Sequence, residues 1–195
     1  MSTFKIALLW TLTGVAAAAP VLHHTDLDSG PPGAYVTVWG ANFPSTPSLT
    51  AGGINVAAVS SSVGATGDTV LTFRIPANAN SSGIIVNGSN TLPFVVRPGR
   101  IFYISTATGS NANDGLSDAN VALGRGPWQD LSKITAMLPG DIVYLRGGTY
   151  TKILNTTYNA NIHITKTASG LPGKPKAMVA YPGEIPVIGN GMNSR

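Results

Sequence analysis

The residues most able to hold a metal ion lie together in one polar stretch, TGSNANDGLS, from Thr108 to Ser117. Asn113 and Asp114 supply amide and carboxylate oxygens there, and calcium prefers oxygen ligands. The spacing does not match an EF-hand loop, and a single carboxylate is weak evidence for a calcium site. The alternative is a turn that Asn and Asp side chains stabilise by bonding their own backbone, ahead of Gly115. Both interpretations place this stretch in a loop.

The chain has few acids suited to catalysis. Glu184 is the only glutamate, and no second carboxylate stands at a fixed spacing from it, so the acid pair of glycoside hydrolysis is not indicated. Asp141 follows Pro139 and Gly140. A carboxylate there is expected to cap backbone N–H groups at the start of a strand rather than to act as an acid or base. We therefore assign no catalytic residue.

Histidine and cysteine usage argues against a transition-metal site. His23 and His24 are adjacent but have no further ligand near them in the sequence, so we expect them in an exposed N-terminal tail. The absence of cysteine excludes disulfides and thiolate metal ligands. The fold must therefore be held by its apolar core, and no cofactor is expected in this chain.

The first 19 residues have the pattern of a secretory signal peptide. Lys5 supplies a charged start, Ile6 to Ala19 is an apolar run, and four alanines precede Pro20. We expect cleavage after Ala18 or Ala19 and a secreted protein. The run is shorter than the roughly 20 apolar residues of a membrane span, and no later segment is long enough, so no membrane span is expected.

Composition predicts an all-β protein. Hydrophobic residues make up 43% of the chain, which is too many for disorder, and Gly (23) and Pro (14) are frequent. Such a mix suits short strands joined by tight turns. Pro98 and Gly99 separate two parts with different patterns, which we take as domains at residues 20–98 and 99–195.

The first part reads as short strands with turn clusters between them, which predicts an antiparallel sandwich. Within it, Leu71, Phe73 and Ile75 are expected on one face of the best alternating segment. The expected strands are Ala34–Trp39, Ile54–Val59, Val70–Ile75, Ile84–Val86 and Leu92–Val96.

The strands and turns of the first part follow a specific order: SGPPGAYVTVWGANF, then AGG, FRIPA and a closing PFVV. Its most distinctive element holds Gly40, Asn42 and Phe43, where Gly40 would allow a close backbone approach and Phe43 would fill the core. This order resembles an IPT/TIG domain, which has an immunoglobulin-like fold. The resemblance implies a spacer or binding module and not a catalytic one.

The second part combines strands with one helix. The segment Trp128–Leu138 has apolar residues at helical spacing, which predicts a short amphipathic helix that ends at Pro139-Gly140. The apolar positions are Leu131, Ile134, Met137 and Leu138. The expected strands are Ile101–Ser105, Asp141–Arg146, Ile162–Thr165, Ala177–Ala180 and Val187–Ile188.

The most specific signature of the second part is PGD-x-x-x-L-x-x-G-x-Y, from Pro139 to Tyr150, which includes Asp141 and Gly148. The segment NDG, ending in Asp114-Gly115, precedes it, and AYPGE-x-PVI follows it. This order resembles the N-terminal cap and first coils of a right-handed parallel β-helix, as in pectate-lyase-like proteins and related polysaccharide lyases. The resemblance implies that the helix covers the open end of the coils.

Only 45 residues follow Tyr150, enough for one or two coils. A coil cannot bury its own apolar face, and at least about three are needed for stability. We therefore expect the chain to be the N-terminal part of a longer protein. In the lyases that it resembles, the basic catalytic residue and the calcium-binding carboxylates lie on later coils. The resemblance thus brings no catalytic residue to this chain and leaves calcium to the full-length parent.

Charge divides unevenly between the two parts. Residues 100–195 hold nine Lys and Arg against five acids, and a basic face would attract an acidic polysaccharide. Nucleic acid is not expected, because basic residues do not cluster with interleaved aromatics. Two functions remain open. The chain is a non-catalytic portion of a secreted, pectate-lyase-like protein that acts on or binds a polysaccharide, or it is a non-enzymatic cell-surface adhesin or carbohydrate-binding protein.

Overall fold

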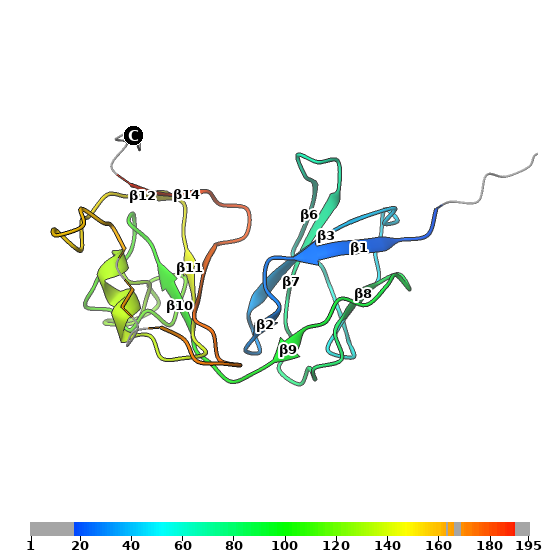
Figure 1. The fold of residues 1–195 in the computed structure, drawn as a ribbon, viewed down its shortest axis with the longest axis horizontal. Helices are drawn as coiled ribbons and strands as arrows, with labels where there is room; N and C mark the ends of the chain where they lie inside the picture. The colour runs from blue at the N-terminus through cyan, green and yellow to red at the C-terminus, as the bar shows by residue number, and fades with distance from the viewer. Residues whose placement is uncertain (1–17, 163, 166–168, 190–195) are drawn as a thin grey trace, which may run out of the picture.

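The structure, a computed structural model, describes residues 18–162, 164–165 and 169–189. The predicted signal peptide lies almost entirely outside this part of the chain. The described part is all-β: strands β1 to β14 are joined by turns and accompanied by one short 3-10 helix, η1 (Figure 1). The prediction of an all-β protein is confirmed. No helix in the described ranges is long and apolar enough to cross a membrane.

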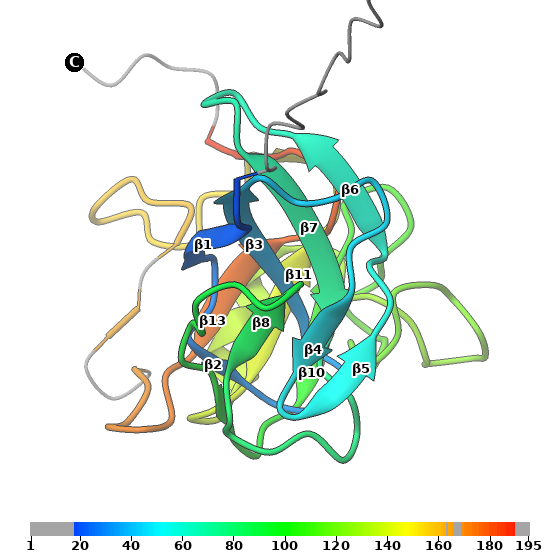
Figure 2. The same ribbon diagram turned by 90° about the vertical axis from the view of Figure 1, so that its right-hand side faces the viewer.

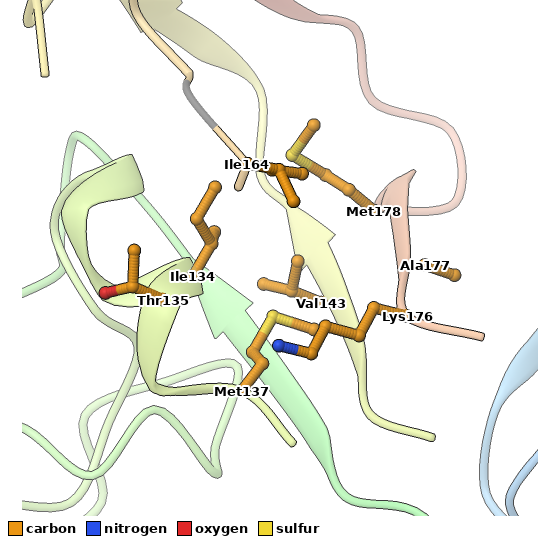
Figure 3. Close-up of a pocket in the computed structure, with 8 residues that line it drawn as sticks. All are labelled: Ile134, Thr135, Met137, Val143, Ile164, Lys176, Ala177 and Met178. Atoms are coloured by element: carbon orange, nitrogen blue, oxygen red, sulfur yellow. The ribbon is translucent and has the colours of Figure 1, made fainter. Parts of the chain in front are cut away.

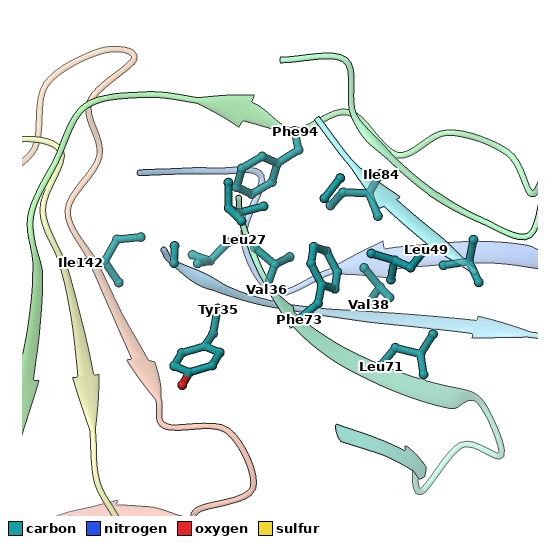
Figure 4. Close-up of a cluster of buried hydrophobic side chains, with 14 of the residues drawn as sticks. Leu27, Tyr35, Val36, Val38, Leu49, Leu71, Phe73, Ile84, Phe94 and Ile142 are labelled. Carbon is teal, nitrogen blue, oxygen red and sulfur yellow. The ribbon is translucent and has the colours of Figure 1, made fainter. Parts of the chain in front are cut away.

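Two antiparallel sheets face each other in the first half of the chain. One has the order β1-β3-β7-β6 and the other the order β5-β4-β8 (Figure 2). Leu71 and Phe73 are fully buried in one core cluster with Leu49 and Ile84, as the alternation predicts (Figure 4). A short parallel pair, β2 with β9, closes this half. The strands are β1 Val21–Thr25, β2 Ser29–Gly30, β3 Tyr35–Ala41, β4 Leu49–Ala51, β5 Ile54–Val56, β6 Ser60–Val63, β7 Thr69–Arg74, β8 Ile84–Val86 and β9 Val95–Val96.

The sequence pattern does not predict β1, β2, β4 or β6. Strand β6 shows why, because it reads Ser-Ser-Ser-Val and all four residues are exposed. It has no apolar alternation, and its extended form comes from antiparallel pairing with β7 at the sheet edge.

His23 and His24 do not lie in a tail, contrary to the prediction. They belong to β1, which pairs with β3 and has a bulge between Leu22 and His24. The His24 ring stacks on Trp39 with centroids 4.6 Å apart, and His23 Nδ1 lies 3.2 Å from Asp68 Oδ1. Pairing with β3 therefore orders this polar segment.

Gly40 allows the close approach of β1 to β3. A Cβ at this position would meet the Val21 carbonyl oxygen and the Phe43 ring. Asn42 follows with a positive φ of 60°, a conformation that Asn tolerates, and its Nδ2 donates to the Ala19 carbonyl at 3.1 Å. These three residues thus fix the path of the chain around the start of β1.

A three-stranded parallel sheet, β10-β11-β13, forms the centre of the second half (Figure 1). Its strands pair in register, and β11 is buried along its whole length. Tyr144 faces the first half of the chain, whereas Val143 faces a second core cluster with Trp128 and Leu131. A second parallel pair joins β12 to β14. The elements are β10 Ile101–Ile104, η1 Leu131–Ala136, β11 Ile142–Leu145, β12 Gly148–Tyr150, β13 Ala177–Ala180 and β14 Pro186–Ile188.

The helix of the second half is shorter and tighter than predicted. It is the 3-10 helix η1 and not an α-helix over 128–138. Leu131, Ile134 and Met137 are spaced by three and are all buried, which suits the three-residue turn of a 3-10 helix, whereas Leu138 is 60% exposed. The Asp130 carboxylate caps the start by accepting the Ser132 N–H at 2.9 Å.

The described residues of the predicted strand at 162–165 do not form a strand. Ile162, Ile164 and Thr165 lie in no strand, and His163 lies outside the described residues.

One tyrosine hydroxyl joins the two halves. Tyr144 Oη accepts the Tyr35 N–H at 2.7 Å and donates to the Tyr35 carbonyl at 2.9 Å, although the two residues are 109 positions apart. Burial raises the pKa of Tyr144, so the hydroxyl stays protonated and can donate. Ile142 and Tyr103 join the same core as Phe73. The first half therefore covers one face of the parallel sheet.

We expect Tyr144→Phe to lower the free energy of unfolding by about 1–3 kcal/mol, because it leaves a buried N–H and a buried carbonyl of Tyr35 without partners. Urea unfolding of both proteins measures the difference. Tyr158→Phe is the matched control, since Tyr158 is 71% exposed, and it should change stability by less than about 0.5 kcal/mol. Equal effects of the two substitutions would contradict this role of Tyr144.

Candidate functional site

The carboxyl ends of the three parallel strands meet at one polar hollow. Ser105, Arg146 and Tyr181 directly follow β10, β11 and β13, and the register of these strands aligns them. A pocket of about 530 Å³ opens beside them, which we call the strand-end pocket. Its lining residues are Ser105, Ala107, Thr108, Asp118, Ala119, Asn120, Arg146, Gly147 and Glu184.

An ion pair forms one wall of the strand-end pocket. Arg146 Nε lies 2.9 Å from both carboxylate oxygens of Glu184, and Arg146 Nη2 lies 2.6 Å from Glu184 Oε1. The same carboxylate accepts the Gly147 N–H. The hydrogen bond from Arg146 holds the pKa of Glu184 below its usual value, so the group is ionised at neutral pH. Both side chains are therefore fixed in orientation.

Asp118 also lines the pocket and links it to the first half of the chain. Its carbonyl accepts Arg146 Nη1 at 3.0 Å, and its carboxylate accepts the Tyr181 hydroxyl at 2.9 Å. The Tyr181 and Tyr35 hydroxyls lie 3.4 Å apart, and Tyr35 Oη accepts Arg74 Nη2 at 2.8 Å. Burial raises the pKa of Tyr181, which keeps its hydroxyl a donor. One hydrogen-bonded chain therefore spans both halves.

The loop that the sequence offers for calcium is held by its own hydrogen bonds. Asp114 Oδ1 accepts the N–H groups of Leu116 at 3.0 Å and of Gly126 at 3.3 Å. Asn113 Nδ2 donates to Asn120 Oδ1 at 3.0 Å, which places this loop against the strand-end pocket. No group of three or more His, Cys, Asp or Glu residues that could hold a metal occurs in the described ranges.

The remaining motif residues shape the backbone and lie outside the pocket. Asp141 is 2% exposed, and its carboxylate accepts the N–H groups of Arg100 and Leu138, after Gly140 with its positive φ of 101°. A Cβ at Gly115 would meet the Trp128 ring.

Tyr150 ends the Pro139–Tyr150 signature and ties two strand ends together. Its single hydroxyl proton is shared between two carbonyl acceptors, Ile104 at 3.0 Å and Arg146 at 2.8 Å, and burial raises its pKa to about 12. Gly148 has a φ of 135°, and a Cβ there would meet the Thr106 hydroxyl at 2.5 Å. Of the residues in the signature, only Arg146 and Gly147 line the pocket. The others set the position of Arg146.

Sequence reasoning misses the pocket's Arg146, Asp118 and Asn120. Arg146 is visible as the last residue of a predicted strand, but its partner Glu184 lies 38 residues further along the chain. Only the stacking of β11 on β13 brings the two together, and no local spacing signals it.

A second, apolar hollow of about 60 Å³ lies between η1 and β13 (Figure 3). Ile134, Met137, Val143 and Met178 point into it, and Met178 is 39% exposed (Figure 3). It continues the core toward the free edge of β13 and offers few polar groups, so it is the weaker candidate for a specific binding site.

The Arg146–Glu184 pair should make the folded protein less stable as the pH falls. The pKa of Glu184 is lowered in the folded protein, so the pair stabilises the fold above the unfolded pKa and loses this effect as the pH falls through the folded value. We expect the wild-type protein to have a higher melting temperature than Glu184→Gln at pH 7. The difference between the two melting temperatures should shrink below about pH 4.3. Melting temperatures between pH 7 and pH 3 measure it, and a constant gap would contradict it.

Comparisons with known proteins do not give a family. No protein-family model matches the chain, and no curated protein matches it. A solved structure from Bacteroides thetaiotaomicron VPI-5482 named "Putative phosphatase" is 15% identical with a TM-score of 0.33, over 41% of this chain and 18% of that one. An auxiliary nutrient binding protein from the same organism is 20% identical with a TM-score of 0.32, over 50% and 25%. The chain spans a quarter or less of each, and this likeness carries no argument.

Proposed function

We propose that this chain is a secreted, non-catalytic module that binds a polysaccharide, with an immunoglobulin-like first half and the first coils of a right-handed parallel β-helix as its second half. The in-register parallel stacks of β10-β11-β13 and β12-β14 support the coil interpretation, because successive coils of a β-helix stack strands in parallel. The two facing antiparallel sheets support the interpretation of the first half.

The strand-end pocket is the observation that carries the proposal. Ligand pockets commonly combine a formed hollow with a few placed polar groups. Here Asp118, Asn120 and Thr108 line the hollow beside the fixed Arg146–Glu184 pair. Sugar hydroxyls both donate and accept, so they suit a wall that mixes carboxylate, amide and hydroxyl groups.

The hydrogen bonds that Glu184 and Ser105 already make favour binding over catalysis. Glu184 is held as a carboxylate by Arg146, which disfavours a general-acid role at neutral pH. The Ser105 hydroxyl accepts from the N–H and the hydroxyl of Thr108, and neither His23 nor His24 is among its hydrogen-bond partners. Lyase chemistry is therefore not proposed for this chain.

The charge of the pocket favours a neutral sugar over an acidic one. The lining of the pocket contains two carboxylates, Asp118 and Glu184, and one guanidinium, Arg146. Arg146 is already bonded to Glu184 and is not available to a uronate, whereas sugar hydroxyls could donate to Asp118. The expected attraction of an acidic polysaccharide therefore does not extend to the strand-end pocket.

A glycan array probed with residues 20–195, followed by titration calorimetry on the best neutral oligosaccharide, tests the proposal. Asp118→Asn keeps the shape of the side chain but removes the charge, and should weaken binding about tenfold or more, because hydrogen bonds to charged groups are the strong ones. Asp68→Asn, on the first half, is the matched control and should bind as wild type does. Absence of binding to every glycan by the folded protein would contradict the proposal.

A further inference from the structure

A buried arginine at the junction of the two halves lacks a full set of partners. Arg97 is only 5% exposed, and its Nε donates to Ser29 Oγ at 3.2 Å while its Nη1 donates to the Gly140 carbonyl. Its Nη2 is buried with no hydrogen-bond partner among the described residues. Buried polar atoms are nearly always paired, so this atom calls for an explanation.

Within the part of the chain that the structure describes, Arg97 also lacks a directly bound carboxylate. Both of its acceptors are neutral. Asp28 is linked to it through the Ser29 hydroxyl, which donates to Asp28 Oδ1 at 3.0 Å, and Asp141 acts on it only through space. Asp141 is already paired with Arg100 at 2.7 Å. By contrast, Arg146 bonds directly to Glu184. A buried cation without an anionic partner is costly, and a bound anion would offset that cost.

Arg97 lines a groove between the two halves. Its hollow of about 350 Å³ has Asp26, Asp28 and Ser29 on one side and Pro175 and Ala177 on the other. It shares Asp28, Ser29 and Pro175 with an adjoining hollow of about 550 Å³, and we call the two hollows together the junction groove. The remaining walls of the adjoining hollow are Pro93, Val95, Leu171, Pro172 and Gly173.

We propose that the junction groove binds an organic carboxylate, whose oxygens accept hydrogen bonds from Arg97. An arginine guanidinium and a carboxylate match in both charge and geometry, and the proline-lined walls would contact the apolar part of the ligand. This site lies apart from the strand-end pocket and does not depend on it. The nearby acids Asp26 and Asp28 oppose an anion, although Asp28 is exposed to solvent and its carboxylate already accepts the Ser29 hydroxyl at 3.0 Å.

Titration calorimetry with three small probes tests the proposal on residues 20–195. Glucuronate and N-acetylalanine carry a carboxylate on a sugar and on a peptide unit, and glucose is the uncharged sugar. We expect at least one carboxylate to bind and glucose not to bind in this groove. Arg97→Met should weaken carboxylate binding about ten- to a hundredfold, the loss of one charged hydrogen-bond pair.

Asp28→Asn gives a second test, in which the direction of the change in carboxylate affinity decides. This test does not require Arg97→Met to fold. Removal of this negative charge should tighten carboxylate binding several-fold, whereas a ligand that donates hydroxyls to Asp28 would bind more weakly. Asp68→Asn, which removes a carboxylate remote from the groove, should leave the affinity unchanged. Weaker carboxylate binding by Asp28→Asn, glucose binding that Arg97→Met weakens as much as it weakens carboxylate binding, or full carboxylate binding by folded Arg97→Met would each overturn the proposal.

The two binding proposals can fail separately. The strand-end pocket is judged by the effect of Asp118→Asn on a neutral oligosaccharide, and the junction groove by the effects of Arg97→Met and Asp28→Asn on a small carboxylate. If Arg97→Met does not fold, the junction-groove proposal is still decided by whether Asp28→Asn raises or lowers the affinity for the carboxylate.

Discussion

The burial of the parallel sheet on both faces is the constraint on which the rest of the structure depends. A short stack of β10, β11 and β13 has two apolar faces, and the structure covers each by different means. On one side η1 and Trp128 pack against Val143 and its neighbours. On the other side Tyr144 enters the core of the first half and bonds both backbone groups of Tyr35. The first half is therefore a structural cover as well as a module, and the two halves share one core.

This shared core explains how both candidate sites are positioned. The register of the parallel strands aligns Ser105, Arg146 and Tyr181, and the tyrosine contacts across the junction hold that end of the sheet against the first half. The junction groove arises from the same docking, because Arg97 reaches from the link between the halves to the Gly140 carbonyl. The junction groove, which both halves line, would not keep its shape if the halves moved independently.

Sequence reasoning predicts what local patterns determine. The alternation around Phe73 gives the buried face of β7, and the place of Asp141 after Pro-Gly gives a carboxylate that caps backbone N–H groups. Sequence reasoning fails where the structure depends on pairing between residues that are far apart in the chain. The edge strand β6 has no apolar pattern, the polar β1 becomes a strand only against β3, and Asp118 meets Tyr181 across 63 residues. The buried charge of Arg97 is likewise invisible, since a lone arginine before Pro98 reads as an exposed linker residue.

The most direct test of the shared core uses one tryptophan in each half as a probe. Trp39 lies on β3 of the first half and Trp128 packs on Phe102 in the second, with ring centroids 4.4 Å apart. Urea unfolding of residues 20–195 is followed by fluorescence in two variants, Trp39→Phe and Trp128→Phe, each of which retains the other tryptophan. A single shared core predicts that far-ultraviolet circular dichroism and fluorescence report one coincident transition in each variant. Separate transitions, with one half losing its tryptophan signal while the other stays folded, would contradict the account.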